Sequence, residues 1–162
     1  MDATTLLKND HDAVRELFRA FAEASGAGAR RDLYRSIRHE LLTHSRVEEQ
    51  VFYPAVMRVR VEPAREAVRG ALEHHHIVDG LMAEIDQLEP EDARYGEKIR
   101  ALQESVERHI EDEEQALFTQ ARIHLTDERL ERLGRDMALL RESLAGETVA
   151  VAVSGSGARV RA

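Results

Sequence analysis

Residues 44–52 read HSRVEEQVF and residues 109–117 read HIEDEEQAL, so a histidine, two glutamates and a glutamine recur in the same order. A weaker repeat pairs residues 10–18 with residues 73–81, which both begin with an acidic residue followed by a histidine. Each half of the chain therefore contains a helix with a core-facing histidine and a helix with the spacing His-x-x-x-Glu. Two such helical hairpins facing each other predict a four-helix bundle with pseudo-twofold symmetry.

The spacing of apolar residues and the positions of helix breakers predict five helices. We expect them at about residues 5–24, 29–60, 63–88, from the break at 89–92 to 125, and 126–145. Pro54 should kink or interrupt the second helix, because proline removes a backbone donor and crowds the preceding turn.

The segment 146–162 contains Ser154-Gly155-Ser156-Gly157 and is expected to be a flexible tail. Residues 149–153 alternate like a strand, but the sequence offers no partner strand for them. The predicted organisation is therefore one bundle domain at residues 1–145 and a tail at residues 146–162.

Composition narrows the possible functions. The chain has 162 residues, of which 33% are charged, 43% apolar and 4% aromatic, a mixture that favours long amphipathic helices. Its formal net charge is −8, and the arginines are scattered among acidic residues, which argues against nucleic acid or an anionic membrane as partner. The chain has no cysteine, which excludes disulfides, thiolate zinc sites, iron–sulfur clusters and cysteine catalysis.

The amino-terminal residues lack the basic and apolar regions of a signal peptide. No apolar run approaches the roughly 20 residues that are needed to cross a bilayer. We therefore expect a cytoplasmic protein without a membrane partner.

Helical periodicity places ionisable side chains on the apolar stripes, because residues i and i+4 lie on one face of a helix. The six inward-facing candidates are His11, His44, Glu48, His74, His109 and Glu113. A buried, unpaired carboxylate costs several kcal/mol or becomes protonated. Metal ions would remove this cost, and imidazole with carboxylate suits iron, manganese or zinc. Six ligands exceed the four that one zinc ion usually takes, so they fit two metal ions bridged by the carboxylates.

The third predicted helix contains three consecutive histidines at residues 74–76, so more than one of them is a candidate ligand. The periodicity directs His74 at the centre of its stripe, and His75 is the alternative. Glu73 and His76 have the Glu-x-x-His spacing of ferritin-like sites, but that fold requires a second such motif and two further glutamates.

Three other polar residues lie beside the candidate ligands. Glu49 and Glu114 either accept hydrogen bonds from ligand histidines or remain solvated charges. Tyr53 is expected to point away from the face that carries His44, so it is not assigned a redox role.

Residues 44–54 contain His-x-x-x-Glu-Glu-x-x-Phe-Tyr-Pro, and residues 109–118 contain His-x-x-x-Glu-Glu-x-x-Leu-Phe. Together with the first-helix histidine, this pattern resembles the hemerythrin-like, HHE cation-binding family over roughly residues 5–125. The resemblance implies an all-α, up-down four-helix bundle with an additional short C-terminal helix. It also implies two iron ions with oxo or hydroxo and carboxylate bridges, and reactions with dioxygen, peroxide or nitric oxide. It assigns the six candidates as ligands, with Glu48 and Glu113 as the bridges.

The chain departs from the oxygen-carrying hemerythrins that it resembles. Those proteins place a second histidine one turn after the third-helix histidine, where Val78 stands here, and their last carboxylate is an aspartate one residue further on. The difference favours peroxide or nitric oxide chemistry, or sensing, over reversible oxygen carriage, and it leaves open whether the protein is an enzyme. The competing hypothesis is a structural or regulatory bundle that binds zinc or another single metal. A monomer or a weak homodimer is expected.

Overall fold

The computed structural model describes residues 1–156, and the side chains of residues 1–145. Within this part the elements are α1 (Ala3–Glu23), α2 (Ala27–Val47), the π-helical turn η1 (Glu48–Phe52), α3 (Tyr53–Met57), α4 (Glu62–Ile85), α5 (Ala93–Asp112), a second π-helical turn η2 (Glu113–Leu117), α6 (Phe118–His124) and α7 (Asp127–Ser156). The all-helical fold class is confirmed for the described residues.

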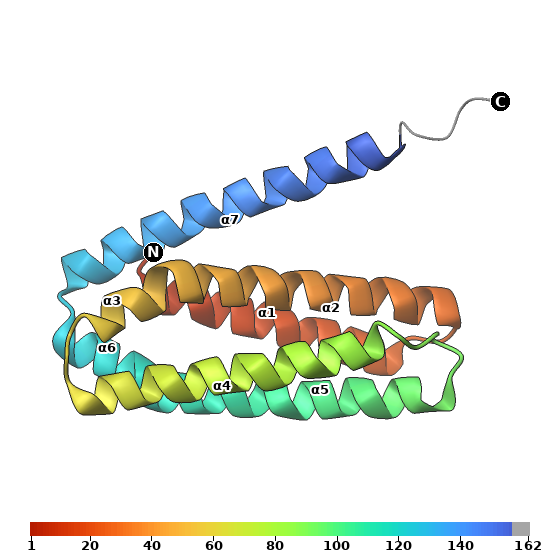
Figure 1. Ribbon diagram of the computed structural model, residues 1–162, viewed down its shortest axis with the longest axis horizontal. Coiled ribbons are helices and arrows are strands. Elements are labelled where there is room, and N and C mark those ends of the chain that lie inside the picture. The colour runs from red at the N-terminus through yellow and green to blue at the C-terminus, as the bar shows by residue number, and fades with distance from the viewer. Residues whose placement is uncertain (157–162) are drawn as a thin grey trace.

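The helices form antiparallel arms that lie side by side, and α7 lies across the outside of them (Figure 1). Helix α1 packs on α2, α4 packs on α5, and α7 contacts both α1 and α2. The turns η1 and η2 join α2 to α3 and α5 to α6, so each pair continues as one long arm. The expected additional C-terminal helix, α7, is therefore present beside the four arms, but with 30 residues it is not short.

Local sequence explains where several helices begin and end. The side chain of Asp2 caps α1 by accepting a hydrogen bond from the backbone N–H of Thr5 at 3.1 Å. The chain leaves α1 at Ala24 and turns at Gly26, whose φ of +91° favours glycine. Pro63 lies in the first turn of α4, where no intrahelical donor is lost. Thr126 precedes α7, and its hydroxyl accepts a hydrogen bond from the N–H of Arg129 at 3.3 Å, as the predicted N-cap requires.

The core consists of two apolar clusters at opposite ends of the bundle. On α1, Leu7 belongs to one cluster and Val14 to the other, and the buried His11 lies between them. On α2 the change of cluster occurs between Leu41 and Val47. A polar layer is thus enclosed by apolar side chains on both sides, which keeps water away from it.

Two predicted boundaries differ from the structure. The helix expected at residues 29–60 contains a π-helical turn just before Pro54, so it is interrupted as predicted but by a different backbone geometry. Helix α7 does not end at Ala145 but continues to Ser156 and includes the segment that alternates like a strand. A single glycine inside a helix costs only about 1 kcal/mol, so Gly146 is not sufficient to end it. The rest of the expected tail, residues 157–162, lies outside the described residues.

Among the described residues, no helix combines the length and the apolar character that are needed to span a membrane.

The close approach of α7 to the start of the chain requires a glycine. A Cβ atom added at Gly134 would lie 2.9 Å from the carbonyl carbon of Asp2 and even closer to the carbonyl oxygen of Met1. We expect Gly134→Ala to lower the free energy of unfolding by about 1–3 kcal/mol, because the backbone must shift. Urea denaturation measures the effect.

Gly80→Ala is the matched control, since nothing lies within 4 Å of a Cβ atom added there. Alanine has the higher helix propensity, so this variant should gain up to about 1 kcal/mol. Equal stability of the two variants would contradict the packing argument.

Candidate metal centre

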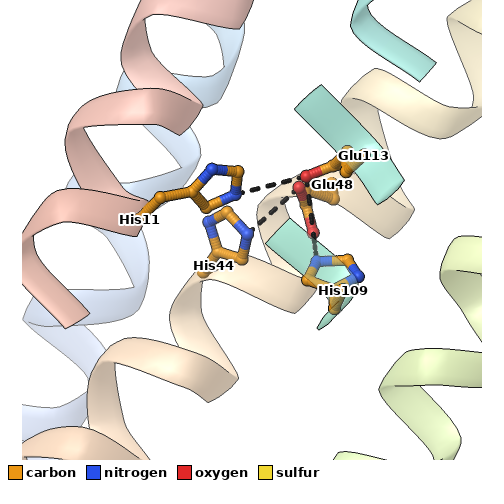
Figure 2. A group of neighbouring side chains, drawn as sticks. All are labelled: His11, His44, Glu48, His109 and Glu113. Carbon is orange, nitrogen blue, oxygen red and sulfur yellow. Dashed lines mark ion pairs between the residues drawn. The ribbon is translucent and has the colours of Figure 1, made fainter. Parts of the chain in front are cut away.

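Five buried side chains converge in the polar layer of the bundle (Figure 2). They are His11 from α1, His44 from α2, Glu48 at the start of η1, His109 from α5 and Glu113 at the start of η2. Each offers one possible ligand atom, and these atoms all lie within 4.8 Å of one another. The structure therefore brings together five of the six residues that the sequence singled out.

Four histidine rings form two pairs. His11 and His44, here called the first pair, have ring centroids 4.9 Å apart. His75 and His109, the second pair, have ring centroids 4.8 Å apart. The first pair belongs to the α1–α2 hairpin and the second to the α4–α5 hairpin, so the pairs repeat the internal symmetry of the sequence.

Glu48 lies between the two pairs. Its Oε1 is 3.1 Å from Nε2 of His44, and its Oε2 is 3.0 Å from Nε2 of His75. The hydroxyl of Tyr53 donates a hydrogen bond to the same Oε2 at 3.0 Å. One carboxylate thus contacts a histidine of each pair.

Glu113 has the corresponding place in the second repeat. Its Oε2 lies 3.2 Å from Nε2 of His11 and 3.7 Å from Nε2 of His109. Both carboxylates therefore connect the first pair with the second, and each has one oxygen or more without a hydrogen bond.

The structure does not bring His74 to this cluster. His75 is the buried residue, with 5% of its surface exposed, whereas His74 is half-buried and its Nε2 lies 3.6 Å from a carboxylate oxygen of Asp112. The expectation that His74 faces the centre of the stripe is wrong, because adjacent residues differ by about 100° around a helix.

A signal in the sequence favoured His75. The buried residues of α4 follow a regular three-and-four spacing that includes this histidine: Ala64, Val68, Ala71, His75, Val78, Met82 and Ile85. Ile77, which shares the face of His74, is 51% exposed. The correct repeat therefore aligns His75 with His11.

Tyr53 was expected to point away from the site, and this was wrong. It is only 2% exposed, and its ring stacks on His75 with centroids 5.5 Å apart. The reason is η1, in which the N–H of Tyr53 bonds to the C=O of Glu48 five residues earlier and the turn holds an extra residue. This insertion rotates the following residues relative to an α-helix, and helical periodicity alone does not reveal it.

The second π-helical turn has the same effect on Phe118, whose N–H bonds to the C=O of Glu113. The ring of Phe118 stacks on His11 with centroids 5.9 Å apart and an interplanar angle of 2°. An aromatic ring therefore covers one histidine of each pair.

Carboxylates outside the cluster orient two of the histidines. Nδ1 of His11 donates to Glu114 at 2.9 Å, and Nδ1 of His75 donates to Glu49 at 2.7 Å. Each glutamate belongs to the opposite repeat from the histidine that it contacts. A histidine that donates from Nδ1 presents the lone pair of Nε2 to the cluster, which is the form that binds metal.

Burial disfavours the charged form of all three histidines of the cluster. It lowers the pKa of His109 to about 3 and, with the neighbouring His44, lowers that of His11 to about 4. Burial also opposes the charge on His44, but Glu48 and Asp10 outweigh it and raise the pKa of His44 to about 10.

The two carboxylates respond in opposite directions. Burial and the adjacent Glu48 raise the pKa of Glu113 well above its ordinary value. Burial also disfavours the charge on Glu48, but His44 and His75 hold its pKa well below the usual range. Without a metal ion, Glu48 is ionised beside His44 and its neighbour Glu113 is protonated, so a second negative charge at the centre requires a further cation.

The donor atoms at the centre fit a metal. Several of them are buried and carry no hydrogen bond, namely Nε2 of His11, His44 and His109, Oε1 of Glu48 and both carboxylate oxygens of Glu113. Buried polar atoms almost always have a partner in native proteins. Cations at the centre would supply that partner for all of them at once.

Comparisons with known proteins agree with this geometry. A family model of the hemerythrin HHE cation binding domain matches residues 2–121, a range that includes the five clustered side chains. The uncharacterized protein Rv2633c of Mycobacterium tuberculosis is 30% identical over 149 residues, which cover 90% of this chain and 89% of that protein.

Two further similarities are more distant. The crystal structure of an HHE cation binding domain-containing protein from Mycobacterium kansasii, an Rv2633c homolog, superposes with a TM-score of 0.82 at 24% identity. The superposition covers 92% of this chain and 90% of that chain, and it shows that the two proteins share a fold. A DNA nickase from Nostoc is 24% identical over 132 residues, which cover 82% of this chain but 37% of that protein.

Proposed function

This chain belongs to the hemerythrin HHE cation-binding domain family, and from that premise we propose that it holds two iron ions that engage dioxygen, peroxide or nitric oxide. The observation that carries the proposal is the position of Glu48 and Glu113, each of which lies between a histidine of the first pair and a histidine of the second. Carboxylates in that position suit a bridging role between two ions.

The arrangement of the donors supports two ions rather than one. The centroids within each histidine pair are 4.9 Å and 4.8 Å apart, whereas those of His11 and His109 are 6.3 Å apart and those of His44 and His109 are 6.2 Å apart. Two imidazoles and shared carboxylate oxygens form a nitrogen and oxygen donor set for each ion. Iron and manganese accept such a set, while calcium and magnesium favour oxygen alone.

Iron at this site would supply electrons and Lewis acidity, and the protein supplies the surroundings. Burial and the charge of Glu48 raise the pKa of Tyr53 well above its ordinary value, so its hydroxyl keeps its proton and can donate a hydrogen bond at the centre. The rings of Tyr53 and Phe118 and the two apolar clusters restrict water.

The size of the reactant follows from this enclosure. A cavity of about 760 Å³ lies at the far end of the bundle, lined by Phe18, Arg30 and Arg100 among others, and none of the five clustered residues lines it. Because the five clustered residues are at most 5% exposed, the centre favours a diatomic molecule or a peroxide over a large organic substrate.

A single ion, such as zinc, is the second candidate. The observation in its favour is that one atom from each of the five clustered residues lies within 4.8 Å of the others. Under this alternative the bundle is structural or regulatory, and the centre has no redox chemistry.

Metal analysis and an absorption spectrum of freshly purified protein test the proposal. We expect about two iron ions per chain and the near-ultraviolet absorption of a bridged ferric pair, because the donor set resembles that of carboxylate-bridged di-iron proteins. A colourless protein without iron after growth in iron-rich medium would contradict the proposal, and one zinc per chain would favour the alternative.

The reaction can be assigned on the same sample. Sustained evolution of oxygen from added hydrogen peroxide would identify peroxide decomposition. A stable, reversible adduct with dioxygen would identify carriage, and a stable nitrosyl spectrum would identify nitric oxide binding. No spectral or catalytic response of the iron-loaded protein to any of the three would contradict the proposed reactivity.

A further inference from the structure

A chain of ionic contacts connects the fifth helix to the first histidine pair. Nη1 of Arg141, on α7, lies 2.7 Å from Oδ1 of Asp10, on α1, and its Nη2 lies 3.5 Å from Glu40 on α2. The other oxygen of Asp10 lies 3.5 Å from Nδ1 of His44. Arg141 therefore reaches a candidate metal ligand through one intervening carboxylate.

Asp10 depends on such a partner, because it is only 4% exposed. A buried carboxylate without a cationic or hydrogen-bonding partner is unfavourable. The guanidinium of Arg141 occupies one oxygen of Asp10 and leaves the other oxygen facing His44. With Nδ1–H of His44 directed at that oxygen, Nε2 is left free for Glu48 and the centre.

The second repeat lacks this arrangement. When His75 is aligned with His11, the residue that corresponds to Asp10 is His74. The ring of His74 lies beside His109 with centroids 6.0 Å apart, so an imidazole stands where the first repeat has a carboxylate. Nδ1 of His109 is buried and carries no hydrogen bond.

The two pairs consequently differ in the number of carboxylates behind them. Glu114 and Asp10 contact the first pair, and Glu49 contacts the second. A carboxylate that accepts the Nδ1 proton of a histidine makes Nε2 a stronger donor to a metal. The internal symmetry of the fold is broken at the position of Asp10.

We propose that Arg141 is a positioning residue of the metal centre, which holds Asp10 against His44 so that the ion served by the first pair is bound more tightly than the ion served by the second. The inference rests on the proposed two-ion centre. It gives α7 a role in the site although the matched family domain ends at residue 121.

Cobalt(II) titration of the metal-free full-length protein, in competition with a chromophoric chelator, tests the proposal. The wild-type protein should bind two ions in separate steps. Arg141→Ala should weaken the tight step by about 10–100-fold, the usual effect of losing an outer hydrogen-bond partner of a ligand. The weak step should change by less than about twofold, because the second pair does not contact Asp10. The visible spectrum of the first cobalt equivalent should change as well.

Matched variants separate positioning from general structure. Asp10→Asn should reproduce the weakened tight step, and the double variant should be no weaker than Asp10→Asn alone, since both act through one contact. Arg135→Ala, on the exposed face of the same helix, should leave both steps unchanged. Circular dichroism checks the fold of each variant. If Arg141→Ala does not fold, Arg141→Lys takes its place; because lysine keeps the charge, this variant should retain part of the tight binding.

Equal weakening of both steps, or no effect of Arg141→Ala and Asp10→Asn on the tight step, would overturn the inference. A double variant whose loss of affinity in the tight step equals the product of the two single losses would also overturn it. Two ions bound with affinities that do not depend on Arg141 would leave the proposed function intact. Fewer than two ions in the wild-type protein would instead contradict the two-ion centre itself.

Discussion

Glu48→Ala should reduce the metal content of the protein from about two ions per chain to well below one, because a shared carboxylate serves both ions. Glu48 contacts His44 and His75, so its loss removes a donor from both pairs at once. Imidazoles carry no negative charge, so the remaining histidines cannot offset the charge of two buried cations. Mass spectrometry of the metals in protein that is purified without chelator measures the effect.

Glu111→Ala is the matched control for this substitution. Glu111 is an exposed glutamate two residues before Glu113, and its removal should leave the metal content unchanged. Glu48→Gln should behave like Glu48→Ala, because a neutral amide is a poor bridge between cations. If Glu48→Ala retained two ions, the bridging assignment would be wrong.

Removal of the metal by a strong chelator should destabilise the folded protein more than any single substitution outside the centre. Ions present at about 1,000 times their dissociation constant stabilise the native state by about 4 kcal/mol for each site. For a protein of this size, the loss of two such sites should lower Tm by about 15–30 °C. Differential scanning calorimetry with and without the chelator gives the value.

The buried carboxyl groups of the metal-free protein contribute to this loss of stability. Glu48 and Glu113 then remain buried side by side, and only one of these two carboxyl groups is ionised. The Glu48→Ala variant is the control, because it should already lack metal and its Tm should not respond to the chelator. A wild-type Tm that is equal with and without chelator would show that the ions are not part of the folded core.

Carboxylates outside the cluster connect the histidines of the centre to other helices. The carboxylates that contact His11 and His75 from outside the cluster belong to the opposite repeat. The carboxylate that contacts His44 is Asp10, on α1 of the same repeat. Loss of the contact between Arg141 and Asp10 would therefore act on the first pair, through His44. If the centre holds two ions as proposed, this asymmetry would make their affinities differ.

The sequence by itself determined the helical fold and most of the centre. The repeat of His-x-x-x-Glu at residues 44–48 and 109–113 predicts paired helices, because residues four apart share a face. His11 lies on the same kind of apolar stripe. Burying these groups without compensation is costly, which is why they predict a site where cations meet them. The structure brings all five of these residues together; their role as ligands stays a prediction.

Only the tertiary structure decided which side chains complete the surroundings. The choice of His75 over His74 depends on how α4 is rotated against its neighbours, and one residue changes that rotation by about 100°. Tyr53 reaches Glu48 because of a π-helical turn, which local periodicity does not specify. The contact of Arg141 with Asp10 joins residues from opposite ends of the chain. Such contacts arise from the packing of whole helices, whereas sequence spacing describes one helix at a time.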